Sequence, residues 1–339
     1  MTGAPAQPLE AGAALLSVRD LVKHYRARGS QRAQGSIVRA VDGVSFDIDE
    51  NETLGLVGET GCGKSTLARL VTRLIEPTGG TITYDGRDIT RWSRSRLRAI
   101  RREIQIVFQD PYSSLNPRRR IGSIIGDPLR VHRIGSTAER RGTIAEALGL
   151  VGLDPAHAQR FPHQFSGGQR QRIGLARALV TKPRLLVADE PVSALDVSIQ
   201  AQILNLIADL RREFGLALLF ISHDVSVIRH VSDRIAVMYL GKIVEIAETD
   251  RLFSAPAHPY TAALLAAAPH ARATTHRQSV VAPPANDEPP SPLSPPSGCR
   301  YRTQCPLAQV ICAELEPPLA PRAGSVVACH FPLDSSPRP

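Results

Sequence analysis

Residues 58–66 constrain the fold of this chain more than any other stretch. They match the phosphate-binding loop G-x-x-x-x-G-K-[ST] at every required position, reading Gly58, Glu59, Thr60, Gly61, Cys62, Gly63, Lys64, Ser65 and Thr66. The small residues let backbone N–H groups turn toward a polyphosphate, and the helix that follows presents its positive N-terminal end to the same charge. Lys64 is then expected to reach the terminal phosphates of a nucleotide, and Ser65 to bind the magnesium ion that bridges them.

The residues around this loop have the pattern of a strand followed by a helix. Residues 53–57 are a short apolar run, and the residues after Ser65 repeat apolar side chains at helical spacing, with Leu67, Leu70, Val71 and Leu74 on one face. This setting supports the motif, because a phosphate loop joins a strand to a helix. Unrelated NTPases and kinases share the loop, so other motifs must decide the class.

A second stretch, residues 165–169, narrows the class. Ser166, Gly167, Gly168 and Gln169 follow Phe165 and precede an Arg-Gln-Arg run. This pattern resembles the signature of ATP-binding cassette (ABC) proteins. The resemblance implies that the phosphate loop of one subunit faces the signature of another subunit, with ATP between them. Leucine is commoner than Phe165 before the serine, and both residues are apolar.

Four polar residues follow apolar strands, and such strand ends are where parallel sheets bind ligands. Gln109, His223 and the pair Asp189 and Glu190 hold these positions. Position alone leaves a surface glutamine, a structural histidine and a solvated acidic turn as alternatives. We expect Asp189 to hold magnesium and Glu190 to act as the general base toward water. The ABC resemblance implies that Gln109 contacts magnesium and the attacking water and that His223 contacts the γ-phosphate.

Tyr25 and Asp196 complete the motifs of the ABC family. Tyr25 precedes the phosphate loop where ABC proteins carry an aromatic residue that stacks on adenine, and a structural tyrosine at a strand end is the alternative. Residues 193–196, which end in Asp196, match the family's D-loop, which crosses the dimer interface. The resemblance covers residues 16–250 with one copy of each motif. We therefore expect one ATPase module that pairs with itself or with a second subunit.

The predicted fold is α/β, with a P-loop NTPase core built on a RecA-like mixed sheet. Period-two alternation within residues 16–50 predicts an antiparallel edge sheet, and the family resemblance predicts an inserted helical subdomain at about residues 94–168. We place the ATPase domain at residues 15–255. Residues 1–14 are predicted to be a disordered tail, and residues 256–339 a C-terminal extension with a Pro-rich linker and a small Cys-rich motif.

The C-terminal extension carries a second, more specific resemblance. Residues 257–265 predict a short helix with a proline at its start, and they resemble the C-terminal segment of the oligopeptide, dipeptide and nickel importer ATPases. Residues 107–117, which include Gln109, resemble the Gln loop of ABC proteins that energise peptide uptake. The Tyr112-Ser113 version of that loop resembles the second of two paired ATPases, so a heterodimer is favoured over a homodimer.

Four of the five cysteines lie in the last part of the chain, namely Cys299, Cys305, Cys312 and Cys329. Disulfides are not expected in a cytosolic ATPase. The spacing lacks the C-x₂-C pairs of zinc ribbons, although four thiolates suit zinc or an iron–sulfur cluster. The sequence around Cys299 resembles the tail of peptide-importer ATPases, some of which carry a [4Fe-4S] cluster. We expect such a cluster, with zinc and with free cysteines as the alternatives.

The charge of the chain leaves one rival function open. The formal net charge is +9, and residues 87–141 hold fourteen arginines against five acidic residues. A basic surface can bind nucleic acid or an anionic membrane face, or can simply be solvated. A soluble ABC ATPase that acts on nucleic acid or ribosomes is therefore the alternative. Such proteins usually carry two cassettes or a long coiled coil, so we expect no nucleic-acid partner.

The resulting functional prediction is an ATP-hydrolysing subunit of a binding-protein-dependent ABC importer for dipeptides or oligopeptides. Nickel or another small solute is an alternative substrate, and the Gln loop and tail disfavour an exporter. ATP and Mg²⁺ are the expected ligands. The expected partners are two transmembrane permease subunits, a second homologous ATPase and an extracytoplasmic substrate-binding protein. No apolar run reaches the roughly eighteen residues of a membrane span, so we expect a peripheral protein on the cytoplasmic face of the membrane.

Overall fold

The structure is a computed structural model, and part of the chain is described by it. The described residues are 14–26, 37–110, 114–193, 195–267, 290–291, 293–322 and 324–333. Residues 1–13 of the predicted N-terminal tail, most of the Pro-rich linker and the Tyr112-Ser113 pair of the Gln loop lie outside these residues. The predictions made for those segments therefore stay predictions.

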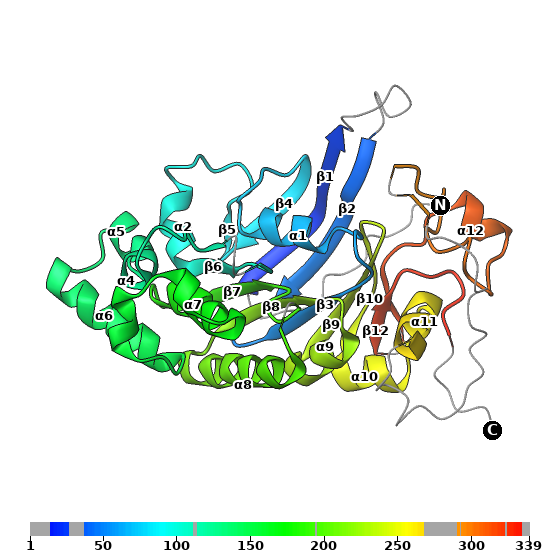
Figure 1. Cartoon of the computed structure of the whole chain (residues 1–339). Coiled ribbons are helices and arrows are strands. Elements are labelled where there is room, and N and C mark those ends of the chain that lie inside the picture. Colours follow the sequence, from blue (N-terminus) through cyan, green and yellow to red (C-terminus); the bar gives the residue numbers. More distant parts are fainter. Residues whose placement is uncertain are drawn as a thin grey trace.

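A mixed sheet lies at the centre of the fold (Figure 1). In the described part of the chain its strands are β3 (Thr53–Val57), β6 (Ile104–Val107), β7 (Leu185–Asp189), β8 (Ala217–Ser222), β9 (Arg234–Tyr239), β10 (Lys242–Glu248), β11 (Ala320–Arg322) and β12 (Ser325–Val327). Their order is β11-β12-β10-β9-β3-β8-β7-β6. Strands β9, β3, β8, β7 and β6 are parallel, and β10, β12 and β11 continue the sheet in antiparallel pairs. This confirms the predicted mixed sheet.

A second, antiparallel sheet packs beside the first. Its described strands, in the order β2-β1-β4-β5, are β1 (Leu16–Arg26), β2 (Ile37–Ile48), β4 (Gly79–Tyr84) and β5 (Arg87–Asp88). The predicted antiparallel edge sheet is confirmed, but β1 and β2 extend well beyond the short apolar runs that the alternation indicated. Polar residues at their distal ends continue the strands because β1 and β2 pair along their whole length.

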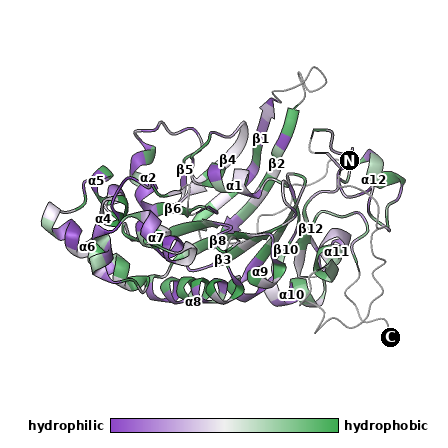
Figure 2. Ribbon diagram, in the orientation of Figure 1, coloured by the Kyte–Doolittle hydropathy of each residue, from purple (hydrophilic) through white to green (hydrophobic). Residues whose placement is uncertain are grey.

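Two cores cover the two faces of the central sheet, and alternate residues of one strand enter each core. Leu218 and Phe220 of β8 pack in the core that also holds helices α7 (Gly167–Leu179), α8 (Val197–Phe214) and α9 (Val225–Val231). Leu219 and Ile221 pack in the other core, with α1 (Lys64–Val71) and the antiparallel sheet. Figure 2 shows the hydrophobic colouring that follows the central strands. Burial on both faces explains why β8 is apolar throughout.

The predicted helical insert consists of short helices at one end of the molecule (Figure 1). They are α4 (Ile121–Ile125), α5 (Asp127–Val131), α6 (Thr137–Leu150) and the 3₁₀ turns Pro155–Gln159 and Pro162–Gln164. The arginine-rich helix α2 (Leu97–Glu103) leads into β6 of the central sheet. The segment 94–168 therefore includes one core strand.

One expectation about α1 is wrong. Leu67, Leu70 and Val71 are buried as predicted, but Leu74 is 46% exposed. The helix ends at Val71, and Arg73 adopts a positive φ of 51°, which turns the chain away from the helix axis. Leu74 therefore does not continue the buried face.

The C-terminal extension packs directly on the ATPase core. It follows α10 (Thr249–Ser254), the last helix of the ATPase domain, and comprises α11 (Pro259–Ala267), α12 (Val310–Glu314) and the β11–β12 hairpin. The expected short helix with Pro259 at its start is α11. Strand β12 pairs with β10, so the extension adds strands to the edge of the central sheet, which the sequence did not predict. Among the described residues, no helix combines the length and apolar character needed to cross a bilayer.

Candidate ATP-hydrolysis site

The phosphate loop turns tightly between β3 and α1, and two of its glycines are required by close backbone contacts. A Cβ on Gly58 would lie 2.1 Å from the carbonyl oxygen of Met238. A Cβ on Gly63 would lie 2.0 Å from the carbonyl oxygen of Ala40, and Gly63 also has φ +113°, a region that L side chains avoid. The glycine spacing of the motif therefore matches the packing of this loop on β2 and β9.

Lys64 points into the loop that precedes it. Its side chain is buried, and its Nζ donates to the carbonyl oxygens of Gly58 at 2.6 Å and Glu59 at 2.9 Å. These carbonyl contacts hold the ammonium group where a loop-bound polyphosphate would lie. The predicted role of Lys64 as a phosphate ligand is compatible with this position.

A cavity of about 390 Å³ opens at the phosphate loop. It is lined by Val38, Arg39, Ala40, Thr60, Gly61, Cys62, Gly63, Lys64, Ser65, Thr66, Gln109, Glu190, His223, Leu240 and Gly241. The structure thus brings the loop together with the glutamine, glutamate and histidine that the sequence placed at strand ends. Sequence reasoning missed two groups, the β2 residues 38–40 and the turn 240–241. Neither group carries a recognisable sequence motif.

Ser65 and Asp189 form the oxygen pair expected for magnesium. The hydroxyl of Ser65 donates to Oδ1 of Asp189 at 3.0 Å, and Asp189 is almost fully buried at the end of β7. Burial raises the pKa of Asp189, and the hydrogen bond from Ser65 opposes that rise. Magnesium prefers oxygen ligands and keeps several waters and substrate phosphates, so one carboxylate and one hydroxyl fit it.

Glu190 is the point where three strand ends converge. Nε2 of Gln109 donates to Oε2 of Glu190 at 2.9 Å, and Nδ1 of His223 lies 3.1 Å from the same oxygen. The Glu190 side chain is 11% exposed, whereas that of His223 is 50% exposed. Glu190 also adopts a positive φ of 47°, a strained backbone region of the kind that clusters at functional sites. The arrangement can orient a carboxylate toward a water molecule at the cavity.

The signature begins helix α7. Ser166 is the N-cap, its hydroxyl accepts from the backbone N–H of Gln169, and Oε1 of Gln169 accepts from the N–H of Ser166, which forms a capping box. A Cβ on Gly168 would lie 2.5 Å from a side-chain carbon of Ile199, so glycine is required there. None of the residues 166–169 lines the cavity of its own chain.

Asp196 and Tyr25 also lie outside the cavity lining. Asp196 is the N-cap residue of α8, and the next residue, Val197, is 82% exposed. Tyr25 lies opposite Val38 in the β1–β2 pairing, with the ammonium group of Lys23 over its ring. The predicted roles of Asp196 at a dimer interface and of Tyr25 under adenine stay predictions.

The four C-terminal cysteines surround one small cavity, which His258 and His330 also line. All five cysteines of the chain are free of disulfides. Burial raises the pKa of the Cys299, Cys305 and Cys329 thiols, which favours the protonated form. Within the described ranges, no three His, Cys, Asp or Glu side chains form a group that could hold a metal ion. The structure therefore does not support the predicted cluster or zinc site.

Comparisons with known proteins agree with this geometry. A family model described as "ABC transporter" matches residues 41–193, and one described as "Oligopeptide/dipeptide transporter, C-terminal region" matches residues 244–312. A dimeric ATP-binding cassette, MJ0796, solved in a post-hydrolysis state with ADP and Pi, superposes with a TM-score of 0.62. It is 30% identical and covers 69% of this chain and 98% of its own. The fold is thus that of an ABC ATPase, and the chain is an ATP-hydrolysing enzyme.

Curated relatives define the family more narrowly. The oligopeptide transport ATP-binding protein AppF of Bacillus subtilis is 51% identical over 323 residues, which are 94% of this chain and 97% of AppF. The dipeptide transport ATP-binding protein DppF of Escherichia coli is 46% identical over 96% of both chains. The chain belongs to this family of oligopeptide and dipeptide transport ATP-binding proteins.

Proposed function

We propose that this chain is the ATP-hydrolysing, energy-coupling subunit of an ABC importer for dipeptides or oligopeptides. The observation that carries the proposal is the match of residues 244–312 to the C-terminal region of oligopeptide and dipeptide transporters. ABC ATPases in general share the phosphate loop, whereas this extension is specific to one group of them. Nickel or another small solute is the alternative cargo, since selection lies in the binding protein and the membrane subunits.

The chemistry proposed for the site follows from its contacts. Phosphate oxygens of ATP replace the carbonyls of Gly58 and Glu59 as partners of Lys64. Ser65 and Asp189 would hold magnesium, which supplies positive charge next to the phosphates when it is bound. Glu190 accepts the proton of the attacking water. Gln109 and His223 keep the reacting carboxylate in place through its Oε2. By the family resemblance, Gln109 also contacts magnesium and the attacking water, and His223 contacts the γ-phosphate.

The signature is proposed to act in a second subunit. Residues 166–169 lie outside the cavity of their own chain, so a facing subunit would supply them to the γ-phosphate. ATP then closes the dimer, and hydrolysis reopens it. A homologous second ATPase is the proposed partner, as the Tyr112-Ser113 sequence suggests. Two permease subunits would dock beside the Gln loop, which places the chain at the cytoplasmic membrane face, with a substrate-binding protein on the other side.

Reconstitution tests the importer function. The tagged chain is purified from its native membranes without oxygen, partners are identified by mass spectrometry, and the complex in proteoliposomes is assayed for ATP-dependent uptake of labelled dipeptides and nickel. Two multi-span subunits, a second ATPase and peptide uptake are the expected result. Nickel uptake alone would change the cargo. Ribosomes or nucleic acid without a membrane partner would overturn the proposal.

Glu190→Gln tests the proposed base in the same complex. The amide keeps the size of the side chain but cannot accept a proton, so turnover should fall by about a hundredfold or more. ATP affinity should stay within about twofold, because the side-chain hydrogen bonds of Glu190 go to Gln109 and His223 and not to the phosphate loop. Asp209→Asn, on the exposed side of α8, is the matched control. Undiminished turnover of the Gln variant would refute the role of Glu190 as the base.

The four C-terminal cysteines can be tested for a bound metal in the same purified sample. We propose that Cys299, Cys305, Cys312 and Cys329 bind a [4Fe-4S] cluster, with zinc as the alternative, because the sequence around Cys299 resembles the tail of peptide-importer ATPases. The four residues line one cavity, but in the described structure their side chains form no group that could hold a metal ion. Iron, sulfide and zinc contents of the anaerobic preparation distinguish these outcomes. A metal-free preparation would leave the cysteines with a packing role only.

A further inference from the structure

The C-terminal extension makes contacts with the phosphate loop that the ATPase motifs do not explain. We propose that this extension positions the phosphate loop for ATP, with Tyr260 and Arg300 as the two positioning residues. Neither residue lines the ATP cavity, so both would act through other residues.

Tyr260 reaches the start of the loop directly. It lies in α11, is 2% exposed, and its hydroxyl accepts a hydrogen bond from the backbone N–H of Glu59 at 3.3 Å. Its ring packs against Tyr239 at 4.5 Å and Tyr301 at 5.4 Å between centroids. The ring is therefore held between the core strand β9 and the extension, and its hydroxyl is aimed at the loop.

The backbone that carries Tyr260 is itself fixed. The carboxylate of Glu245 in β10 is fully buried and accepts from the N–H groups of Ala257 and His258, each at 2.8 Å. Nδ1 of His258 accepts from the N–H of Tyr260 at 3.0 Å. The bond to His258 satisfies one of the first donors of α11, which a helix leaves unpaired at its start, and the bonds to Glu245 fix the two residues before the helix. Movement of Tyr260 away from Glu59 would break them.

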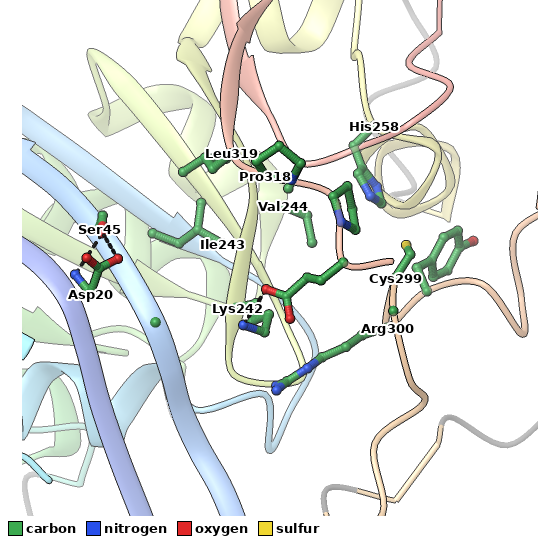
Figure 3. Close-up of a pocket in the computed structure, with 16 residues that line it drawn as sticks. Asp20, Ser45, Lys242, Ile243, Val244, His258, Cys299, Arg300, Pro318 and Leu319 are labelled. Atoms are coloured by element: carbon green, nitrogen blue, oxygen red, sulfur yellow. Dashed lines mark hydrogen bonds and ion pairs between the residues drawn. The ribbon is translucent and has the colours of Figure 1, made fainter. Parts of the chain in front are cut away.

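Arg300 holds the middle of the loop, at Cys62, through a turn. It is 6% exposed, and its guanidinium donates to the carbonyl oxygen of Leu240 and to Oδ2 of Asp42. Figure 3 shows Arg300 extending from the segment beside Cys299 toward the end of the β9–β10 hairpin near Lys242. The same turn is bonded to the loop, because the N–H of Gly241 donates to the carbonyl oxygen of Cys62 at 2.8 Å.

The turn needs such support. Leu240 has φ +42°, which is unfavourable for a residue with a side chain, and Gly241 has φ +85°. The N–H of Asp42 also donates to the carbonyl oxygen of Gly241 at 2.9 Å. Arg300 and Asp42 therefore each bond one of the two residues of the turn. Leu240 and Gly241 also line the ATP cavity. Displacement of the turn would therefore move the cavity wall and Cys62 together.

The two contacts hold the loop at Glu59 and at Cys62, on either side of the exposed residues Thr60 and Gly61. A loop already ordered before ATP arrives loses less conformational freedom on binding, and the apparent affinity falls in proportion to any population of incompetent conformations. The reacting groups Glu190, Gln109 and His223 are not part of either contact. Loss of the contacts should therefore weaken ATP binding and leave the rate at saturating ATP unchanged.

Tyr260→Phe is the first test, in the full-length protein with its partners. It removes only the hydroxyl, and we expect the Kd and KM for MgATP to rise about two- to tenfold, with kcat and Tm within experimental error of the parent protein. Tyr301→Phe is the matched control, since it removes a hydroxyl from the same aromatic group without touching the loop, and should change neither constant. Equal affinity of Tyr260→Phe and Tyr301→Phe would refute the role of Tyr260.

Arg300→Lys is the second test. Lysine keeps the charge next to Asp42 but cannot bond the carboxylate and the Leu240 carbonyl with one planar fork. We expect a similar rise in the KM for MgATP at unchanged kcat. Arg302→Lys is its control, because Arg302 donates to Ser297 within the extension and not to the turn. If KM is unchanged in both Tyr260→Phe and Arg300→Lys, or if kcat falls as much as KM rises, the extension does not position the loop.

Discussion

Glu245 offers the sharpest test of how the extension is attached. Its carboxylate is fully buried and is the acceptor for two backbone N–H groups at the start of α11. Glu245→Ala would leave both donors unsatisfied, at about 1–3 kcal/mol each. Removal of a buried carboxylate offsets part of this cost, since burial already raises the pKa of Glu245 and so disfavours its charged form. We expect a net loss of about 3 kcal/mol in the free energy of unfolding.

Hydrogen exchange followed by mass spectrometry is the measurement, because it locates the loss. Peptides that contain residues 257–267 should exchange faster by about a hundredfold in Glu245→Ala, as a loss of about 3 kcal/mol implies, and the slowest amides of β3 and β8, which exchange through global unfolding, should accelerate by no more than that factor. Urea unfolding gives the global value. Unchanged exchange at α11, or a global loss under about 1 kcal/mol, would refute the reasoning.

Glu245→Gln is the control for charge. One amide oxygen replaces two carboxylate oxygens, so at most one N–H keeps a good acceptor and a smaller loss of about 1 kcal/mol follows. Since the folded-state pKa of Glu245 is raised, its stabilisation is complete below the unfolded-state pKa and is lost as pH rises through the folded-state pKa. The advantage of the parent protein over Glu245→Gln should therefore shrink from acidic to neutral pH. An advantage that grows instead would contradict the burial argument.

Three further predictions concern the sites themselves. Ser166→Ala removes the N-cap of α7 and should lower the free energy of unfolding by about 1 kcal/mol, while ATP binding to the single subunit persists. ATP-dependent dimerisation, measured by light scattering, should be lost. Dimerisation that survives would contradict the proposed role of the signature. His223→Ala removes a half-exposed partner of Glu190 and should lower turnover at least about tenfold with Tm almost unchanged, whereas full turnover would exclude a positioning role. Cys305→Ser should lose any bound iron or zinc without loss of ATP affinity; unchanged metal content would reject Cys305 as a ligand.

Much of the ATP site could be predicted because its parts are local. The glycine spacing of the phosphate loop reflects close backbone contacts at Gly58 and Gly63, which no other residue type tolerates. Apolar runs of strand length predicted β7 and β8, and residues after parallel strands share one edge of the sheet. Glu190 and His223 therefore lie at the same edge, although the distance of 3.1 Å between Oε2 of Glu190 and Nδ1 of His223 could not be read from the sequence.

Other features depended on where elements end and which edges they meet. The exposure of Leu74 follows from the turn at Arg73, whose positive φ carries no clear sequence signal. The addition of β11 and β12 to the central sheet depended on an unpaired edge at β10, which exists only once the sheet has formed. The four cysteines share a cavity, but whether their thiols approach closely enough for a metal is a matter of packing and not of spacing.

The sequence by itself determined the class of the protein, because a phosphate loop, a capped signature and carboxylates at strand ends are patterns of neighbouring residues. Only the tertiary structure decided how the extension meets the ATP site. The bond from Glu59 to Tyr260 joins residues 201 positions apart, and the Arg300–Asp42 pair spans 258 positions. Such contacts arise when separate elements pack, and neither partner carries a local periodicity or motif that names the other. The reacting residues of the site can thus be recognised from local sequence patterns, whereas the contacts that support the site arise only from tertiary packing.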